Sequence, residues 1–300
     1  MQYRDRWNEN EVNVSALRQI LALISKGGIL GPNYSPFPLV NGRIDMRGID
    51  FTRHKWKSVV AIGVDFSGCT LSYCWVEECR FENCLFEKTE MIQRTDHANK
   101  FVDCDFVRSK CNQMGFGNRG SQFAHCRFDQ CNLTRANFYR PEFDWCVFSN
   151  CKLNGLDFWG SSFENCAFAG KVEDVWFRGG YPLPGMEKEY GVPRKNRMLN
   201  VSFADAEVIG GTFSDGCDLS TILLPQKGNY RLYSGWRQRL ERLPSIYENW
   251  PPMEKREADI FMHSHLSHAI RQDWYLLNVD QMRKEYGQEL FDKLLHEMDC

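Results

Sequence analysis

The chain has 300 residues, with 13 cysteines, 21 phenylalanines, a formal net charge of −2 and a sequence pI near 6.4. Hydrophobic residues make up 43% and charged residues 25%, a composition that excludes a largely disordered chain and a collagen-like repeat. The balanced charge does not indicate a nucleic-acid-binding surface, and no apolar run is long enough to predict a membrane span. The polar N-terminus is unlike a signal peptide. We therefore expect a cytoplasmic protein whose cysteines are reduced.

The first predicted element is a helix over residues 12–26. Its apolar residues fall on one helical stripe, Leu17, Ile20, Leu21 and Ile24, as in a helix that packs on one face only. Ser15 is a candidate for its first residue and Gly27 for its end. We assign residues 1–43 to this helix and the lead-in that follows it.

Residues 44–224 carry a large apolar residue at every fifth position, a period that fits neither a helix nor an ordinary strand. The frame runs from Met46 to Phe116, slips by two residues, resumes from Phe123 to Phe168 and returns at Phe203. A small residue, usually cysteine, stands two positions before many of the apolar ones. The blocks include CRFEN, CLFEK, CDFVR, CRFDQ, CNLTR, CVFSN and CKLNG.

This pattern resembles that of the pentapeptide-repeat family. The resemblance implies a right-handed, four-sided β-helix with one pentapeptide on each side and 20 residues in each coil. The central residue of each block and the residue two positions before it would point inward. We expect a mainly β fold: a quadrilateral β-helix over residues 44–224, an N-terminal helical cap in residues 1–43 and an α-helical region in residues 225–300.

A lag of 20 residues tests this geometry within the sequence. The central column consists of Phe66, Phe86, Phe106, Phe128, Phe148 and Phe168, once the slip near Asn118 is allowed. The column two positions earlier contains Cys84, Cys104, Cys126, Cys146 and Cys166. We predict that both columns are core, because a buried thiol behaves as a small hydrophobic group. Coils stacked at about 4.8 Å would make a rod on the order of 35 Å long.

Three irregularities interrupt the frame. In Gln93–Lys100, Arg94 and Asp96 occupy positions that should be apolar, so we expect the chain to bulge outward there. The slip contains the letters GFGNRG, but further repeats follow it, so its glycines are interpreted as part of a bulge and not as a dinucleotide site. The third interruption includes residues 178–200, which we expect to project as a loop.

Residues 225–300 are predicted to form helices over 230–243, 253–275 and 280–298. A solenoid exposes apolar core at both ends, so this region could cap it, form a homodimer or bind a partner. Three histidines lie close together in the second predicted helix: His263, His265 and His268. We interpret them as residues on the helix surface and not as a metal site. The first predicted helix carries four arginines and a tryptophan: Arg231, Arg237, Arg239 and Arg242, with Trp236. We interpret them as a solvated surface; the alternative is that they bind an acidic partner or a nucleic acid.

Sorting the outward positions by side predicts two candidate partner-binding walls. The first carries Trp75, Tyr139 and Trp159, with His97 near them. The second is acidic and also carries Trp145; its acidic residues are Glu82, Asp103, Glu142, Asp144 and Glu164. Exposed aromatic residues are typical interface anchors. The alternative is that the 178–200 loop or the C-terminal helices cover these aromatics.

No sequence motif of a hydrolase, kinase, P-loop or zinc protease is present, so we expect a non-catalytic scaffold without cofactor or metal that binds a protein partner. Quinolone-resistance members of the family suggest an alternative, a DNA mimic that binds a type II topoisomerase. Residues 44–224 hold 24 acidic and 21 basic residues, so only a segregated acidic face could imitate DNA. A toxin-neutralising or immunity protein is the third hypothesis.

Overall fold

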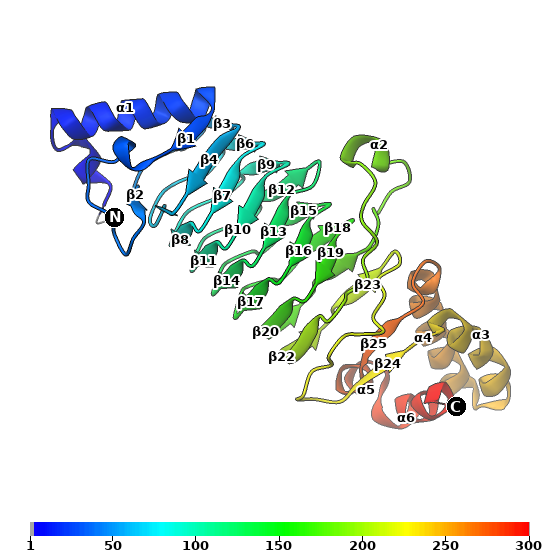
Figure 1. Cartoon of the computed structure of the whole chain (residues 1–300). Coiled ribbons are helices and arrows are strands. Elements are labelled where there is room, and N and C mark those ends of the chain that lie inside the picture. Colours follow the sequence, from blue (N-terminus) through cyan, green and yellow to red (C-terminus); the bar gives the residue numbers. More distant parts are fainter. Residues whose placement is uncertain (1–2, 300) are drawn as a thin grey trace.

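A computed structural model describes residues 3–299, with the backbone alone at 117 and 118. The chain forms a straight rod of stacked coils, with a helix across its N-terminal end and a helical unit at its C-terminal end (Figure 1). Three parallel sheets form three sides of the rod. The fourth side is joined by isolated parallel bridges, among them Asp50 to Thr70 and Glu90 to Lys110. This is the four-sided β-helix of about seven turns that the repeat predicts.

The strands of each sheet follow one another along the rod, one strand per coil. The sheet that we call the acidic wall has seven strands: β1 (Gly28–Leu30), β4 (Val59–Ile62), β7 (Arg80–Glu82), β10 (Lys100–Val102), β13 (Gln122–Ala124), β16 (Glu142–Asp144) and β19 (Ser162–Glu164). A second sheet has eight: β2 (Ile44–Asp45), β5 (Val64–Asp65), β8 (Leu85–Glu87), β11 (Asp105–Val107), β14 (Arg127–Asp129), β17 (Val147–Ser149), β20 (Ala167–Glu173) and β22 (Ser202–Ile209). The third, which we call the aromatic wall, also has eight: β3 (Lys55–Lys57), β6 (Trp75–Glu77), β9 (Thr95–His97), β12 (Gly115–Asn118), β15 (Asn137–Tyr139), β18 (Asp157–Trp159), β21 (Trp176–Arg178) and β23 (Thr212–Ser214).

The predicted columns form the core of the rod. Phe106 lies in register with Phe86 and Phe128, and its ring stacks on theirs at centroid distances of 4.8 and 4.7 Å. All the predicted central phenylalanines and small-column cysteines are at most 1% exposed. The twelve cysteines among the described residues are buried and free, whereas Cys300 lies outside the described part of the chain. Identical rings stack because parallel in-register strands place each one directly above the last.

Sharp corners separate the walls, and they need a left-handed backbone. Asn83, Asp103, His125 and Trp145 occupy one column of corners, each with φ between 50° and 53°. Such a residue costs about 1–2 kcal/mol unless it is glycine. The ladders on both sides of each corner hold it in place, as for Asp103, whose amide donates to the carbonyl of Ala124 at 3.0 Å.

The slip in the frame is a β-bulge, as predicted. Strand β12 pairs with β9 at Gly115 and Thr95 and then at Asn118 and His97, so one extra residue enters β12 between these pairs, and the second enters between Asn118 and Gln122. Beyond the bulge the ladder continues in register, with Gln122 opposite Lys100.

The expectation that Gln93–Lys100 bulges outward is wrong. Strand β9 pairs in register with β6, and Arg94 and Asp96 are both fully buried in the core. The Arg94 guanidinium donates to Asp96 Oδ1 from Nε at 3.0 Å and from Nη2 at 2.7 Å. Asn99 Nδ2 donates to the same oxygen at 3.0 Å and to the carbonyl of Val76 at 2.9 Å. The three polar residues are linked through Asp96 Oδ1, so this coil keeps its inward positions without apolar side chains, although Asp96 Oδ2 has no partner among the described residues.

The N-terminal end is closed by α1 (Glu11–Lys26) and two short 3-10 helices, η1 (Asp5–Asn8) and η2 (Pro32–Tyr34). Helix α1 begins after Asn10, whose side chain accepts a hydrogen bond from Asn13 N at 2.9 Å, and not at Ser15. It ends at Gly27, as predicted. The ladder itself begins earlier than residue 44, because β1 already pairs with β4.

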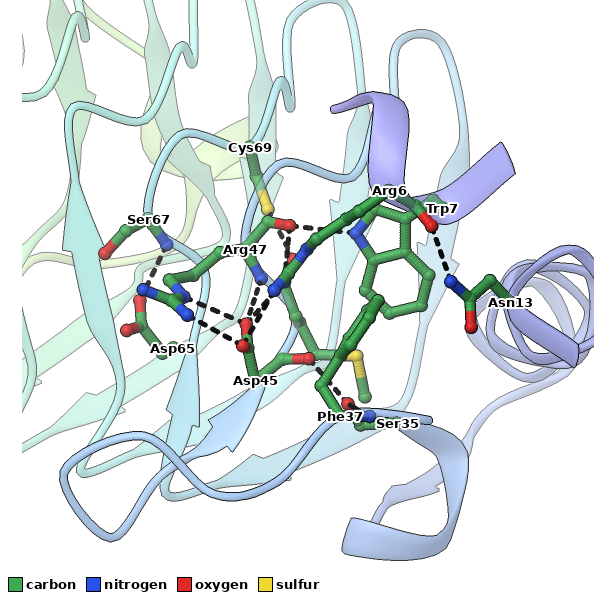
Figure 2. Close-up of polar contacts among 11 residues, drawn as sticks. Arg6, Trp7, Asn13, Ser35, Phe37, Asp45, Arg47, Asp65, Ser67 and Cys69 are labelled. Carbon is green, nitrogen blue, oxygen red and sulfur yellow. Dashed lines mark hydrogen bonds and ion pairs between the residues drawn. The ribbon is translucent and has the colours of Figure 1, made fainter. Parts of the chain in front are cut away.

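A buried carboxylate ties this cap to the first coil (Figure 2). Asp45 is 2% exposed and accepts hydrogen bonds from Arg6 at 2.5 and 2.8 Å and from Arg47 at 2.9 and 3.0 Å. The Trp7 indole donates to the carbonyl of Arg47 at 2.8 Å. Burial alone would raise the pKa of Asp45, but the hydrogen bonds from Arg6 and Arg47 outweigh it and hold that pKa well below its usual range.

The C-terminal region differs from the three predicted helices. It contains β24 (Tyr230–Tyr233), α3 (Trp236–Ile246), η3 (Tyr247–Asn249), α4 (Pro252–Ala269), β25 (Tyr275–Asn278), α5 (Val279–Tyr286) and α6 (Gln288–Asp299). The first four residues of the predicted helix 230–243 form β24, which pairs antiparallel with β25; strand β25 overlaps the predicted helix 253–275 only at Tyr275. Helix α3 continues past Pro244. The last predicted helix is divided at Gly287, whose φ of 85° suits a helix end.

This helical unit caps the last coil. Gln272 is 3% exposed; its Oε1 accepts from the amides of Gly216 and Cys217 at 3.1 and 3.0 Å, and its Nε2 donates to the carbonyl of Cys217 at 2.7 Å. The Tyr230 hydroxyl bonds with both backbone groups of Val208. Side chains of the cap therefore form hydrogen bonds with backbone N–H and C=O groups of the last coil, which would pair with a further coil if the rod continued.

Candidate partner-binding wall

The aromatic wall contains the residues that the sequence placed together, but they form two separate clusters. Trp75 lies on β6 and His97 on β9, whereas Tyr139 lies on β15 and Trp159 on β18. The order of strands is β6-β9-β12-β15-β18, so the bulged strand β12 separates the two clusters.

The first cluster is the stack of Trp75 on His97. Their ring centroids are 3.9 Å apart and their planes differ by 23°. Trp75 remains 43% exposed, whereas His97 is 6% exposed and its Nε2 has no hydrogen-bond partner among the described residues. Burial lowers the pKa of His97, and the positive charges of Arg119 and Lys55 lower it further against the opposing effect of Glu77. The ring is therefore neutral at pH 7.

The second cluster is partly covered by the loop, as the alternative interpretation proposed. Tyr190 at the end of α2 (Glu187–Tyr190) stacks on Tyr139 at 5.2 Å, and Trp159 meets Tyr139 edge-on at 5.0 Å. Tyr139 and Trp159 are half-buried. Burial raises the pKa of Tyr190 to about 12, with a further contribution from Glu189. These residues support the loop instead of forming a bare platform.

The loop projects over less of its length than predicted. Helix α2 stands away from the rod (Figure 1), and Leu183 and Val192 beside it are 65% and 77% exposed. The last part of the loop, residues 196–199, packs against the acidic wall instead. Asn196 is 1% exposed, with its Oδ1 accepting from Phe163 N, and Asn165 N donates to the carbonyl of Leu199. The returning chain occupies the place of a missing coil strand.

Arg140 joins the loop to the bulge. Its guanidinium donates to the carbonyl of Arg119 and, at 3.4 Å, to the carbonyl of Val192. Both neighbouring glycines are needed for this approach: a Cβ at Gly191 would lie 2.5 Å from Arg140 Nη1, and one at Gly120 would lie 2.7 Å from Nε. The Tyr181 hydroxyl also closes the loop by donating to the carbonyl of Gly191 at 2.7 Å.

The acidic wall has the five predicted carboxylates, and basic side chains pair with two of them. Arg80 pairs with Glu82 at 2.6 Å, and Arg197 pairs with Glu164 at 3.1 Å. The other three carboxylates form no ion pair within the described residues: Asp103, Glu142 and Asp144. Trp145 is 57% exposed at the corner of this wall, stacked loosely on His125 at 6.3 Å.

The structure places one member of each side-chain group singled out in the C-terminal region, His265 and Trp236, inside the helical unit. His265 is buried against Trp236 and Phe261, and burial lowers its pKa to about 4, with a smaller contribution from His268. Within residues 3–299 no group of three or more potential ligands could hold a metal ion. Arg237 pairs with Glu241, and Arg239 donates to the carbonyl of Met298.

The sequence did not identify four residues that shape the aromatic wall: Arg119, Arg140, Tyr181 and Tyr190. The segment GFGNRG could have indicated Arg140, because the glycines of a bulge make room for a long side chain from the next coil. The packing of Tyr181 and Tyr190 had no signal, because the loop has no repeat from which its path could be inferred.

Comparisons with known proteins found one family match and several distant structural neighbours. The model of the family "Pentapeptide repeats" matches residues 119–155 and 142–170, with eight copies. A trypsin-treated form of QnrB1, "a plasmid-mediated fluoroquinolone resistance protein", aligns at 11% identity and a TM-score of 0.40 over 57% of this chain and 82% of its own. HetL, "involved in Heterocyst Differentiation Regulation" in the cyanobacterium Nostoc, aligns at 10% identity and a TM-score of 0.27 over 63% and 84%. The search of curated proteins found no match.

Residues 119–170 match the pentapeptide-repeat family, and the in-register columns extend the same five-residue repeat along the rod. The structural neighbours are too distant to add to this likeness. None of the helices in the described part combines the length and hydropathy needed to cross a membrane.

Proposed function

We propose that this chain is a non-catalytic scaffold that binds a protein partner through the aromatic wall and the loop above it. The observation that carries the proposal is the exposed Trp75 on a rigid sheet, together with a pinned loop that presents Leu183 and Val192 to solvent. Large exposed apolar side chains next to polar ones are typical of interaction sites.

The pinned loop supports this proposal because it is organised before binding. Tyr190, Tyr181 and Arg140 hold its two ends to the wall and to the bulge. A loop that is already ordered loses little conformational entropy when a partner binds. Its two exposed apolar residues then act as fixed contacts and not as a flexible tether.

The distribution of ion pairs weighs against the alternative of DNA mimicry by binding to a type II topoisomerase. A mimic needs a face with many unpaired carboxylates, because duplex DNA carries one charge per about 1.7 Å. Here carboxylates on two walls are paired within the sheet, for example Glu82 with Arg80, Asp105 with Arg127 and Glu87 with Arg108. A supercoiling assay with purified gyrase, in which the protein has no effect at any concentration, would remove this alternative.

The proposal is tested by two tryptophan variants that differ only in the wall they occupy. The tagged chain, Trp75→Ala and Trp145→Ala are used to capture partners from the source cells, and the captured protein is then titrated against each variant by calorimetry. We expect Trp75→Ala to weaken binding at least tenfold and Trp145→Ala to have no effect, with the same Tm for both. Equal binding by all three forms would contradict the assignment to the aromatic wall. Trp159→Ala is a poor variant for this purpose, because Trp159 supports the loop.

A further inference from the structure

A diagonal stripe of side chains crosses the aromatic wall from Trp75 to the loop. It passes from Trp75 on β6 to His97 on β9, then to Arg119 directly after β12 and Arg140 directly after β15, and ends at Val192. Neighbouring members are linked by the stack of Trp75 on His97 and by the bonds of Arg140 to the carbonyls of Arg119 and Val192. The bulge in β12 creates this stripe, because it moves Arg119 to the corner one rung before Arg140.

Two positive charges in this stripe have no carboxylate partner. Arg119 and Arg140 form no ion pair within the described residues, in contrast to Arg80, Arg108 and Arg127, each of which has a carboxylate oxygen within 4 Å. The Arg140 guanidinium bonds only to backbone carbonyls. Adjacent rungs place the two corner residues about 4.8 Å apart along the rod, where like charges repel. An anion between them would relieve this repulsion.

Glu77, a carboxylate at the Trp75 end of the stripe, does not fill that role. Glu77 accepts from the Trp75 indole at 3.4 Å and lies 3.8 Å from Lys55. Glu77 therefore already has polar partners, and it lies on the rung of Trp75, away from Arg119 and Arg140.

Two buried nitrogens in the same stripe also lack partners. His97 is 94% buried and its Nε2 makes no hydrogen bond with described residues, and Arg140 Nε is in the same condition. A buried polar group without a partner costs about 1–3 kcal/mol. An acceptor brought to this stripe would lower that cost, whereas an apolar partner would add to it.

We propose that the stripe binds an extended acidic segment of the protein partner, with one or two carboxylates at Arg119 and Arg140 and apolar side chains on Trp75 and Val192. This inference rests on the proposed function and adds the chemistry of the partner. Guanidinium groups are well suited to carboxylates because they donate in a planar fork. The exposed face of Trp75 offers an apolar or aromatic contact.

The dimensions of the wall set the length of the segment. Three rungs separate β6 from β15, which is about 14 Å along the rod at the usual strand spacing. The stripe also crosses three residues, from the first residue of β6 to the corner after β15, which is about 10 Å across the strands. An extended chain advances about 3.3 Å per residue, so five to six residues span the diagonal of about 17 Å from Trp75 to Arg140. The expected pattern is an apolar residue, then one or two acidic residues three to five positions away, then another apolar residue.

A randomised heptapeptide array tests the inference without knowledge of the natural partner. The labelled full-length protein is applied at low salt and at about 0.5 M salt. We expect the selected peptides to be enriched in aspartate and glutamate at the central positions, and to lose at least tenfold in binding at high salt, because the contact is electrostatic. Selected peptides without acidic enrichment, or no selection at all, would overturn the inference.

Two arginine variants locate the contact. Arg119→Ala should reduce the affinity for a selected acidic peptide at least tenfold. Arg135→Ala is the matched control, because Arg135 is also an exposed corner residue with a positive φ and forms no ion pair in the described part of the chain, but it lies on another side of the rod. Equal losses in both variants would overturn the inference. The partner captured from the source cells is also titrated with Arg119→Ala. If it binds this variant as well as it binds the wild type, the proposal of an acidic segment is wrong, although the proposed function stands.

Discussion

The buried ion pair of Arg94 and Asp96 makes a sharp prediction about stability. The two residues replace inward side chains of the repeat: Asp96 stands in the column of Val76, and Arg94 in the column of Met114. The informative variants are therefore Asp96→Val, Arg94→Met and the double variant, each of which restores a side chain that the same column already contains.

The structure sets the expected magnitudes. Both side chains are fully buried, and Asp96 Oδ2 has no hydrogen-bond partner among the described residues. Removing one member leaves an uncompensated buried charge, which costs about 3–5 kcal/mol. Replacing both by apolar residues of suitable size is neutral or stabilising by about 1–4 kcal/mol. Thus Asp96→Val and Arg94→Met should each destabilise the protein, and the double variant should recover most of the loss.

Protonation separates the two single variants. Burial raises the pKa of Asp96, against the opposing effect of Arg94. A carboxyl whose pKa is raised by folding binds its proton more tightly in the folded state, so stability increases as pH falls from above that pKa toward its unfolded value. Without Arg94 the pKa rises further. Arg94→Met should therefore regain stability between pH 7 and pH 5, whereas Asp96→Val has no titrating group at this place and should not.

Urea unfolding at pH 7 and pH 5, followed by circular dichroism and tryptophan fluorescence, measures these effects. The two probes should coincide, and the slope of free energy with urea should match that of the wild type, so that the difference in midpoint reports stability. A double variant that loses the sum of the two single losses would refute the argument that the charges are costly only when separated. Identical pH dependence in the two single variants would refute the assignment of the raised pKa.

Further predictions concern the core and the cap. Phe128→Ala removes a fully buried ring stacked on Phe106 and Phe148 at 4.7 Å each and should cost about 3–5 kcal/mol in urea unfolding; a midpoint equal to that of the wild type would contradict the stacked column. Asp45→Asn should cost about 1.5–3 kcal/mol, because charge-assisted hydrogen bonds are lost. Since folding depresses the pKa of Asp45, its contribution is present above the unfolded pKa and is lost as pH falls through the folded one, so the difference between the wild type and Asp45→Asn should shrink below about pH 4. Native Cys104 should resist thiol reagents for as long as the rod stays folded, measured by mass spectrometry, and rapid labelling would show that the column is accessible.

The five-residue repeat by itself determines the path of the rod. A residue such as Phe106 has one geometrically equivalent neighbour in each adjacent coil, so a lag of 20 residues, or of 22 across the bulge, identifies its contacts. The same arithmetic places Trp75, Tyr139 and Trp159 on one wall, because an outward position stays on its wall in every coil. Periodicity converts sequence distance into spatial distance, and that is why this part was predictable.

Only the tertiary structure decided what happens where the period fails. In the sequence, Arg94 and Asp96 are polar residues at positions where the repeat has apolar ones. They can be buried in the core because they form hydrogen bonds with each other and with Asn99. Tyr190 reaches Tyr139 across 51 positions that no repeat relates, so the cover over the second aromatic cluster could not be inferred. The place of the Arg140 guanidinium follows from the bulge and the loop together, because each supplies one of the two carbonyls that accept its hydrogen bonds.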